Sequence, residues 1–382
     1  MDEQNPQSVA RRLVTLGQNV SLSIVAVLLS VGLVEIGVRA LGLAAPGGVA
    51  TVDTRDFERI PGPFEPGQLV VDRRLRSLPF EVRTNALGYR GAEIAATKGS
   101  DEYRVFFAGD SLTFGDFVDD NQTLPFQLEQ RLSVCTPRVR VVNGGLGGSS
   151  IDTQRSLVER ALGLAPDQVV LMFYENDVGD LAQPLAADLA RNRAARARLP
   201  LSVVYPVLRR LATWNLLLEA RASVRARGRV DRRRTPDATV ADESSASAKV
   251  ADLRAKYGVE LDGLIELVNA RRVPLTFATY PSHLTLATGA RSDTLTWVEA
   301  LAAERHIEPV ALLNALLASG LGASDLYLLP LDGHPRPLAY RLVAEPLTLA
   351  VIRHSKGRLH CPGLDQSGTA RASRPDREES LE

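Results

Sequence analysis

Short apolar runs alternate with helical patterns through the middle of the chain. Five of these runs have the length of buried strands: residues 104–108, 138–142, 168–173, 273–278 and 307–312. After the first run, Thr123 is a typical N-cap residue, and Leu124, Leu128 and Leu132 follow it at helical spacing. This alternation predicts an α/β fold with three αβα layers around a mostly parallel central sheet. In such folds the functional residues lie at the carboxyl ends of the strands.

A long apolar segment near the N-terminus predicts a transmembrane helix. Residues 20–34 contain no charged side chain, and the wider stretch 13–43 adds only one acid, Glu35, and one base, Arg39. Because about 20 apolar residues span a bilayer, the segment is long enough only if Glu35 lies near an interface. A signal peptide cleaved after residues 43–45 is the alternative. The length of the run and the positions of its two charges favour an uncleaved anchor.

The charges that flank this segment predict its orientation. Arg11 and Arg12 precede it closely, whereas only Arg39 directly follows it. By the positive-inside bias, the N-terminus is cytoplasmic. We therefore expect a single-pass protein of the cytoplasmic (inner) membrane, attached through its N-terminal helix, with the main domain on the extracytoplasmic side.

These patterns divide the chain into four parts. Residues 1–43 are expected to form a cytoplasmic stub and the anchor, and residues 44–84, which are rich in Gly and Pro up to position 67, a tether. Residues 85–355 form the main domain, with a helical or disordered insertion at about 180–248. Residues 356–382 are expected to be a disordered tail, because residues 362–382 lack apolar periodicity.

The insertion has a composition of its own. An apolar stripe at residues 201–218, which includes Trp214, predicts a helix that lies over a functional site or on the membrane surface. Residues 221–234 carry seven arginines and are followed by an acidic, serine-rich run at 242–247. Charge runs of this kind are usually solvated and mobile, and a contact with phospholipid or another polyanion is the alternative.

Composition removes some classes of partner. The chain has 45 Lys and Arg residues against 45 Asp and Glu residues, so its overall charge does not favour nucleic acid. Two cysteines, Cys135 and Cys361, allow one disulfide in an exported domain, or two buried thiols. The sequence leaves that choice open. No spacing of cysteines and histidines suits a metal site, and no cofactor is expected.

The first strand ends where a nucleophile could be presented. Residues 109–115, with the sequence Gly-Asp-Ser-Leu-Thr-Phe-Gly, follow the apolar run directly. Ser111 thus lies at a strand-to-helix turn, where the N-terminus of the next helix faces developing negative charge. Since Gly, Asp and Ser are also ordinary turn residues, the motif alone is weak.

Three later segments supply what a serine nucleophile needs. A glycine-rich turn at residues 143–150 can bring backbone N–H groups close to a ligand, and the Walker and Rossmann patterns are incomplete there. Asn176, after the third strand, can offer its amide to an oxyanion or can serve as a helix cap. His334, in the run Leu-Asp-Gly-His-Pro at residues 331–335, can take the serine proton, and Asp332 can fix its tautomer.

The remaining histidines have no comparable carboxylate beside them and are expected to be structural or solvated: His283, His306, His354 and His360.

Together the four segments resemble the SGNH hydrolase superfamily, also called GDSL esterases and lipases, over roughly residues 85–350. The resemblance implies a flavodoxin-like αβα fold in which Ser111 is the nucleophile, His334 the general base and Asp332 its orienting partner. It also implies an oxyanion hole formed by the backbone N–H groups of Ser111 and Gly148 and the side-chain amide of Asn176.

Two positions depart from the superfamily pattern. Tyr174 occupies the usual Gly position of the third block, beside Asn176. Asp332 and His334 are separated by one residue where the superfamily usually has two. This shorter spacing, and the run Asn-Ala-Leu-Gly-Tyr-Arg-Gly at residues 85–91, look like a bacterial membrane-anchored subset.

The resemblance implies a serine ester hydrolase that acts on an acyl ester, O-acetyl esters included, of a small molecule or a glycan. An O-acyltransferase that modifies a cell-surface polysaccharide is an alternative, because a triad does not choose between water and a sugar hydroxyl. A non-catalytic carbohydrate-binding or scaffold protein that retains the fold is an alternative of another class. The intact set of Ser111, Asp332, His334 and Asn176 counts against it.

Overall fold

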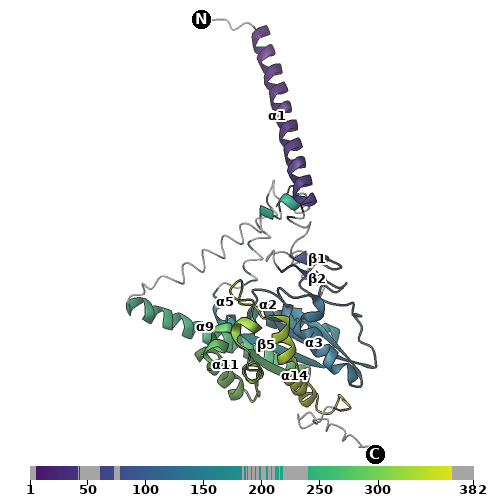
Figure 1. Cartoon of the computed structure of the whole chain (residues 1–382), viewed down its shortest axis with the longest axis vertical. Helices are drawn as coiled ribbons and strands as arrows, with labels where there is room; N and C mark the ends of the chain where they lie inside the picture. Colours follow the sequence, from purple (N-terminus) through teal and green to yellow (C-terminus); the bar gives the residue numbers. More distant parts are fainter. Residues whose placement is uncertain are drawn as a thin grey trace, which may run out of the picture. The chain divides into compact units, whose positions relative to one another are not determined.

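The computed structural model describes residues 6–41, 43, 61–72, 78–182 and 240–363, with isolated positions between 185 and 217 (Figure 1). These residues belong to two compact units. One contains residues 1–49 and 198–235, and the other contains residues 50–197 and 236–382.

The larger unit is built on a five-stranded parallel sheet in the order β4-β3-β5-β6-β7. The strands are β3 (Glu102–Gly109), β4 (Arg138–Gly145), β5 (Gln168–Tyr174), β6 (Leu275–Tyr280) and β7 (Val310–Ala311). The register pairs Gly109 with Gly145, and Tyr174 with Tyr280, so the carboxyl ends of the strands meet at one edge. The predicted parallel sheet is confirmed.

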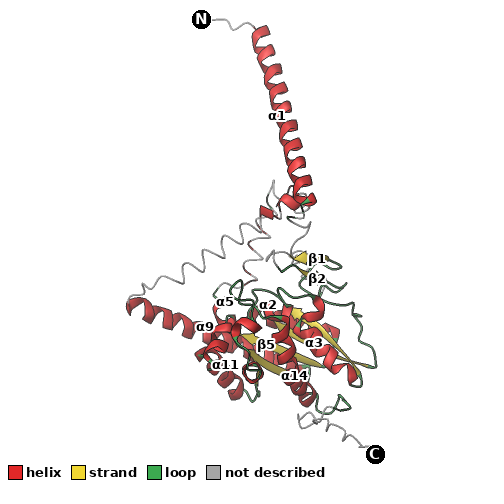
Figure 2. Cartoon of the chain, viewed as in Figure 1, coloured by secondary structure: helices red, strands yellow, loops and turns green. Residues whose placement is uncertain are grey.

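Helices cover both faces of this sheet (Figure 2). Consecutive strand residues bury opposite faces: Phe106 lies in the core cluster with α4 (Ile151–Ala161), α9 (Val240–Ala270) and α11 (Asp293–Glu304). Phe107 lies in the cluster with α3 (Leu124–Arg131), α12 (Leu313–Ala318) and α14 (Pro337–His354). The three αβα layers predicted from the sequence are therefore present, and Thr123 caps α3 as expected.

Short helices lie at the strand ends and in the connections. They are α2 (Ser111–Phe114), α5 (Asp177–Asp180), α10 (His283–Thr288), α13 (Ala323–Leu326) and the 3₁₀ turns Asp120–Gln122, Leu132–Val134 and Leu162–Leu164.

The predicted tether is too long. Its described part, residues 61–72 and 78–84, includes the antiparallel pair β1 (Leu69–Asp72) and β2 (Phe80–Arg83). Phe64, Phe80 and Val82 are buried in the same core cluster as Phe106. Burial of these three side chains fixes the segment to the larger unit, whereas residues 44–60 of the predicted tether lie outside the described residues.

The outer edge of β4 is covered by side chains and by a turn from this N-terminal region. The Glu129 carboxylate accepts a hydrogen bond from the Val141 N–H at 2.7 Å, and its other oxygen accepts one from Arg140 at 2.9 Å. Farther along the strand, Arg90 forms an isolated β-bridge with Asn143. Thus backbone groups at Val141 and Asn143, on the side of β4 that faces no other strand of the sheet, have partners within the chain.

The boundaries of the insertion and of the tail also differ from expectation. Helix α9 begins at Val240, so the acidic run at 242–247 lies in a helix instead of a mobile segment. The arginine-rich segment 221–234 and most of the apolar stripe at 201–218 lie outside the described residues. The chain is ordered as far as residue 363, beyond the predicted start of the tail at 356, and residues 364–382 are not described.

A disulfide explains the order at the C-terminal end. Cys135 and Cys361 are bonded across 226 residues of sequence. Beside them, Thr136 and His360 exchange two backbone hydrogen bonds of 2.7 and 2.8 Å. The structure therefore answers the question that the sequence left open.

The smaller unit contains α1 (Pro6–Ala40), whose residues 15–40 are long and apolar enough to cross a membrane; a signal sequence would meet the same criterion. Near its C-terminal end, the Glu35 carboxylate accepts hydrogen bonds from the N–H groups of Ala212 and Thr213 at 2.8 and 2.9 Å. It also accepts one from Arg39 at 2.6 Å. Both oxygens of the Glu35 carboxylate therefore accept hydrogen bonds.

Candidate active site

Ser111 lies at the carboxyl edge of the sheet, as the first residue of α2. The preceding Asp110 caps this helix, because its carboxylate accepts a hydrogen bond from the Leu112 N–H at 2.9 Å. Gly109 is required just before it: a Cβ at this position would lie 2.1 Å from the Thr113 Oγ1 and 3.2 Å from the Met172 carbonyl oxygen. Strand, glycine and cap together present the hydroxyl at the strand-to-helix turn.

His334 reaches Ser111 from the loop between α13 and α14. Its Nε2 lies 2.9 Å from the Ser111 Oγ, and its Nδ1 is hydrogen-bonded to the Asp332 Oδ1. The same carboxylate oxygen accepts the backbone N–H of His334 at 2.9 Å. The loop is held in place because Leu328 donates to the His334 carbonyl at 3.0 Å. One intervening residue therefore suffices for Asp332 to orient the ring, which accounts for the short spacing in the sequence.

The charges around His334 favour its protonated form. Burial lowers the pKa of the imidazole, but the hydrogen bond to Asp332 and the negative charges of Asp116, Asp332 and Asp110 outweigh it, so the net pKa is raised. Asp116 comes close on the side of the ring opposite Asp332, with its Oδ2 4.0 Å from Nε2. A raised pKa makes the imidazole a stronger base for the serine proton.

Sequence reasoning missed Asp116 and Phe117, which follow α2. The Phe117 ring packs edge-on against the His334 ring, with centroids 5.1 Å apart. Phe117 has a positive φ of 66°, which a bulky residue rarely adopts. The two residues lie five and six positions after the serine, but nothing in their spacing shows that the chain turns back toward the histidine.

Two buried carboxyl groups lie beneath the turn. Burial raises the pKa of Asp110 to about 6, and the negative charges of Asp180 and Asp116 act in the same direction. Burial also raises the pKa of Asp177 well above its usual value, and the charges of Asp110 and Asp180 add to this effect. Asp177 is tied to its surroundings, since its Oδ2 accepts the Tyr174 N–H at 3.3 Å and its carbonyl accepts the Ser150 hydroxyl at 2.5 Å. These contacts link the ends of β5 and of the glycine-rich turn.

The glycine-rich turn approaches the serine at Gly147. A Cβ on Gly147 would lie 3.7 Å from the Ser111 Cβ and 3.8 Å from the Asp116 Oδ2. Gly148, the residue singled out by the resemblance, has a φ of 73°, in the left-handed region. Backbone from this turn is therefore beside the nucleophile, with Gly147 the nearer contact.

Asn176 lies at the start of α5, where its side chain does not cap the helix. Its Nδ2 donates to the Asp180 Oδ2 at 3.0 Å. An amide nitrogen has two N–H groups, and one of them donates to Asp180. Tyr174, at the position usually occupied by Gly, is largely buried, and burial raises the pKa of its phenol.

Of the other histidines, His283 lies beside the loop that carries His334, since a Cβ on Gly333 would lie 3.2 Å from the His283 Nδ1. The Nδ1 of His354 lies 2.8 Å from the Thr276 Oγ1, and burial lowers its pKa. The ring of His283 packs edge-on against Tyr327, with centroids 6.0 Å apart. Among the residues described, no group of three or more His, Cys, Asp or Glu side chains could hold a metal ion.

Comparison with known proteins gives matches only to solved structures. No family model matches the chain, and no curated protein matches it. A member of the lipolytic G-D-S-L family from Veillonella parvula is 14% identical, with a TM-score of 0.35, over 64% of this chain and 95% of that chain. An acetylxylan esterase from Geobacillus stearothermophilus is 15% identical, with a TM-score of 0.38, over 68% and 96% of the two chains. A psychrotrophic esterase from Pseudoalteromonas sp. is 11% identical, with a TM-score of 0.35, over 65% and 96%.

These low scores do not by themselves assign an activity, so the assignment depends on the geometry of the chain itself. That geometry is an αβα fold in which Ser111, His334 and Asp332 form a hydrogen-bonded series at the carboxyl edge of the parallel sheet.

Proposed function

We propose that the chain is a serine ester hydrolase of the SGNH superfamily. The observation that carries this proposal is the series from the Ser111 hydroxyl through the His334 imidazole to the Asp332 carboxylate. Each member has the partner that nucleophilic catalysis requires: a base for the hydroxyl, and a carboxylate for the base.

The chemistry follows from this order. His334 Nε2 takes the proton from Ser111 as Oγ attacks the acyl carbonyl carbon, and the carbonyl oxygen becomes an oxyanion. Collapse of the tetrahedral intermediate breaks the bond to the alcohol oxygen, which leaves with the proton from Nε2. Water then attacks the acyl carbon as His334 Nε2 takes its proton. Collapse of the second tetrahedral intermediate breaks the bond between the Ser111 Oγ and the acyl carbon, the carboxylic acid leaves, and Oγ recovers its proton from Nε2. Asp332 stabilises the imidazolium that forms in both halves of the reaction.

A fluorophosphonate probe tests this function directly, because it labels a serine only when a neighbouring base activates it. The folded full-length protein should be labelled in detergent, and Ser111→Ala should not be. Ser149→Ala is a matched control, since this buried serine, in the neighbouring turn, bonds the Gly109 carbonyl at 3.3 Å and not the histidine. Labelling that persists in Ser111→Ala, or a folded wild-type protein that is never labelled, would contradict the proposal.

The proposed oxyanion hole consists of the backbone N–H groups of Ser111 and Gly148 and the amide of Asn176. We infer that the bond to Asp180 holds the Asn176 amide so that its second N–H can point to the oxyanion. Asn176→Ala should lower kcat for p-nitrophenyl acetate by about 10²- to 10³-fold, with little change in KM, because the donor acts mainly in the transition state.

Asp180→Ala separates the role of the Asn176 amide as a donor from the support that Asp180 gives it. It keeps the donor but removes its support, so we expect a smaller loss of kcat than in Asn176→Ala. If Asn176→Ala kept its wild-type kcat, the amide would have a structural role only, and the third donor would have to be sought elsewhere.

We further propose that α1 is an uncleaved anchor and that the hydrolase lies outside the cytoplasmic membrane. The length and composition of residues 15–40, and the engagement of Glu35 near the end of the helix, support this proposal. An alkaline phosphatase fusion after residue 382 should be active, whereas a fusion after residue 12 should not. The full-length protein should stay in the membrane fraction after a carbonate wash.

Two results would overturn this arrangement in different ways. A soluble product that starts near Pro46, with an active fusion, would show a cleaved signal peptide. An inactive C-terminal fusion would place the domain in the cytoplasm and remove exported polysaccharides from the range of substrates.

A further inference from the structure

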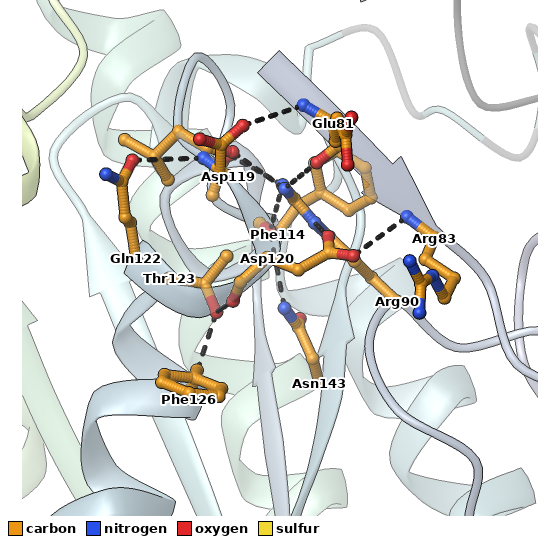
Figure 3. A network of polar contacts seen from close by, with 12 residues as sticks. Glu81, Arg83, Arg90, Phe114, Asp119, Asp120, Gln122, Thr123, Phe126 and Asn143 are labelled. Atoms are coloured by element: carbon orange, nitrogen blue, oxygen red, sulfur yellow. Dashed lines mark hydrogen bonds and ion pairs between the residues drawn. The ribbon is translucent and has the colours of Figure 1, made fainter. Parts of the chain in front are cut away.

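The turn at residues 85–91 contains a buried arginine whose donors are all used. Arg90, which is 3% exposed, donates through Nε to the Asp120 carboxylate at 2.7 Å. Its Nη1 donates to the carbonyl groups of Phe114 and Gly115 at 3.0 and 2.7 Å, and its Nη2 donates to those of Glu81 and Val118 at 2.9 and 2.7 Å. These five bonds match the five N–H donors of a guanidinium, and Figure 3 shows them converging on one side chain.

Three of the five acceptors lie at the end of α2 and in the segment that follows it. The carbonyls of Phe114, Gly115 and Val118 flank Asp116 and Phe117, the two residues that contact the far side of His334. The backbone here is constrained, because Gly115 and Phe117 both have positive φ values, of 88° and 66°. Arg90 therefore clamps both ends of this loop. Two of the three carbonyls have a second donor, since Phe114 O also accepts from the Asn143 Nδ2 at 3.3 Å and Gly115 O from the Val118 N–H at 3.4 Å.

The arginine is itself held rigidly from both sides. Within its own turn, the Asn85 Oδ1 accepts the N–H groups of Leu87 and Tyr89 at 3.0 and 3.1 Å, and the Tyr89 side chain is buried. On the opposite side, Asp120 accepts the Arg83 N–H at 3.1 Å as well as the Arg90 guanidinium (Figure 3). A cavity of about 590 Å³ adjoins this network, but Ser111, Asp332 and His334 are not among its lining residues.

We propose that Arg90 is a positioning residue for the reaction: it fixes the loop of residues 115–118 so that Asp116 and Phe117 set the charge and the orientation of the His334 imidazole. The proposal rests on the hydrolase activity proposed above. It gives the 85–91 run a role beyond packing, since Arg90 bonds to the Glu81 carbonyl of the N-terminal hairpin and to the Gly115 and Val118 carbonyls of the catalytic loop. The Phe80 ring of the hairpin also packs edge-on against the Phe117 ring, with centroids 5.7 Å apart.

The chain offers a matched control in Arg104, which is also fully buried. Its guanidinium donates to Glu102 at 2.6 Å and to the carbonyls of Leu164 and Ala95 at 2.9 and 3.0 Å. Arg104 lies near the amino end of β3, whereas the catalytic residues lie beyond the carboxyl end of the same strand. Both Arg104→Lys and Arg90→Lys replace a planar guanidinium by a compact ammonium in a buried hydrogen-bond network. Of these two arginines, only Arg90 bonds to the loop of residues 115–118.

Arg90→Lys should lower kcat for p-nitrophenyl acetate by about 10- to 100-fold, because small displacements of a catalytic group are costly. KM should change little. The acidic limb of kcat/KM against pH should move to lower pH, because the loop would carry the negative charge of Asp116 away from His334 and lower the pKa of the imidazole. Asp332 and Asp110 also face this ring, but they remain in place. Arg104→Lys should keep both kcat and the acidic limb of wild type, whatever its loss of thermal stability.

A double-mutant cycle sharpens the test. Asp116→Asn should itself move the acidic limb to lower pH, and adding Arg90→Lys should then shift it no further, because the charge that Arg90 positions is gone. Additive shifts would overturn the proposed coupling. An Arg90→Lys protein with wild-type kcat and a wild-type pH profile would reduce Arg90 to a structural role.

If Arg90→Lys does not fold, Asp120→Asn provides the test, since it weakens the hold on the guanidinium without removing the arginine. It should lower kcat and move the acidic limb in the same directions, by smaller amounts. An Asp120→Asn protein with wild-type kcat and a wild-type pH profile would also count against the proposal. Failure of the proposed hydrolase function can be told apart from failure of the Arg90 proposal. In the first case the wild-type protein itself would hydrolyse no ester.

Discussion

Ser111→Ala should lower p-nitrophenyl acetate hydrolysis by at least about 10³-fold and leave the fold intact. The change removes the only atom that could form the acyl-enzyme, and with it the 2.9 Å contact to the His334 Nε2. It removes no cap, because the α2 helix is capped by Asp110. Steady-state kinetics measures the loss of rate, and far-ultraviolet circular dichroism of the same preparations measures whether the fold is retained.

His334→Ala should cause a loss of similar size, since nucleophile and base act as a unit. Asp332→Asn should cost less, because a Ser–His pair retains part of the chemistry while the ring loses its orienting carboxylate. A Ser111→Ala or His334→Ala protein with near wild-type rates and an unchanged spectrum would rule out the triad.

Removal of the disulfide should have the largest effect on stability. Replacing both Cys135 and Cys361 by serine should lower the free energy of unfolding by about 3–5 kcal/mol, because the bond closes a loop of 226 residues that the unfolded chain would otherwise explore. Urea denaturation of the larger unit, followed by tryptophan fluorescence, measures the change.

The reduced wild-type protein is the matched comparison for this double variant. Both should unfold at the same lowered urea concentration, since both lack the same covalent link. A double variant as stable as the oxidised protein would show that the paired backbone groups of Thr136 and His360 are enough to hold the C-terminal segment.

The sequence predicted the sheet because each strand is a short apolar run that ends in a polar or glycine-rich turn. The same rule placed Ser111 and the glycine-rich turn at one edge, since parallel strands bring their carboxyl ends together. The pairing of Ser111 with His334 depended on the family resemblance, because 223 residues separate them and no local pattern records their contact.

Other parts of the site could not be read from local patterns for a related reason. Arg90 bonds to carbonyl groups that lie 24–28 residues away, and backbone carbonyls have no signature in the sequence. The β1–β2 pair was mistaken for a tether because Gly and Pro dominate the start of the segment. Phe64, Phe80 and Val82 are too few to form a periodic pattern, yet they are enough to fix it to the core.

The covered edge of β4 has a consequence for crowding. Open edge strands are templates for aggregation, and natural proteins block them with charged side chains, bulges or short strands. Here Glu129 and Arg90 occupy groups along one edge of the sheet, and the strand at the other edge, β7, is two residues long. The proposed anchor would concentrate the protein in two dimensions, where copies meet often, and this sheet would offer them little unpaired edge backbone for strand-to-strand association.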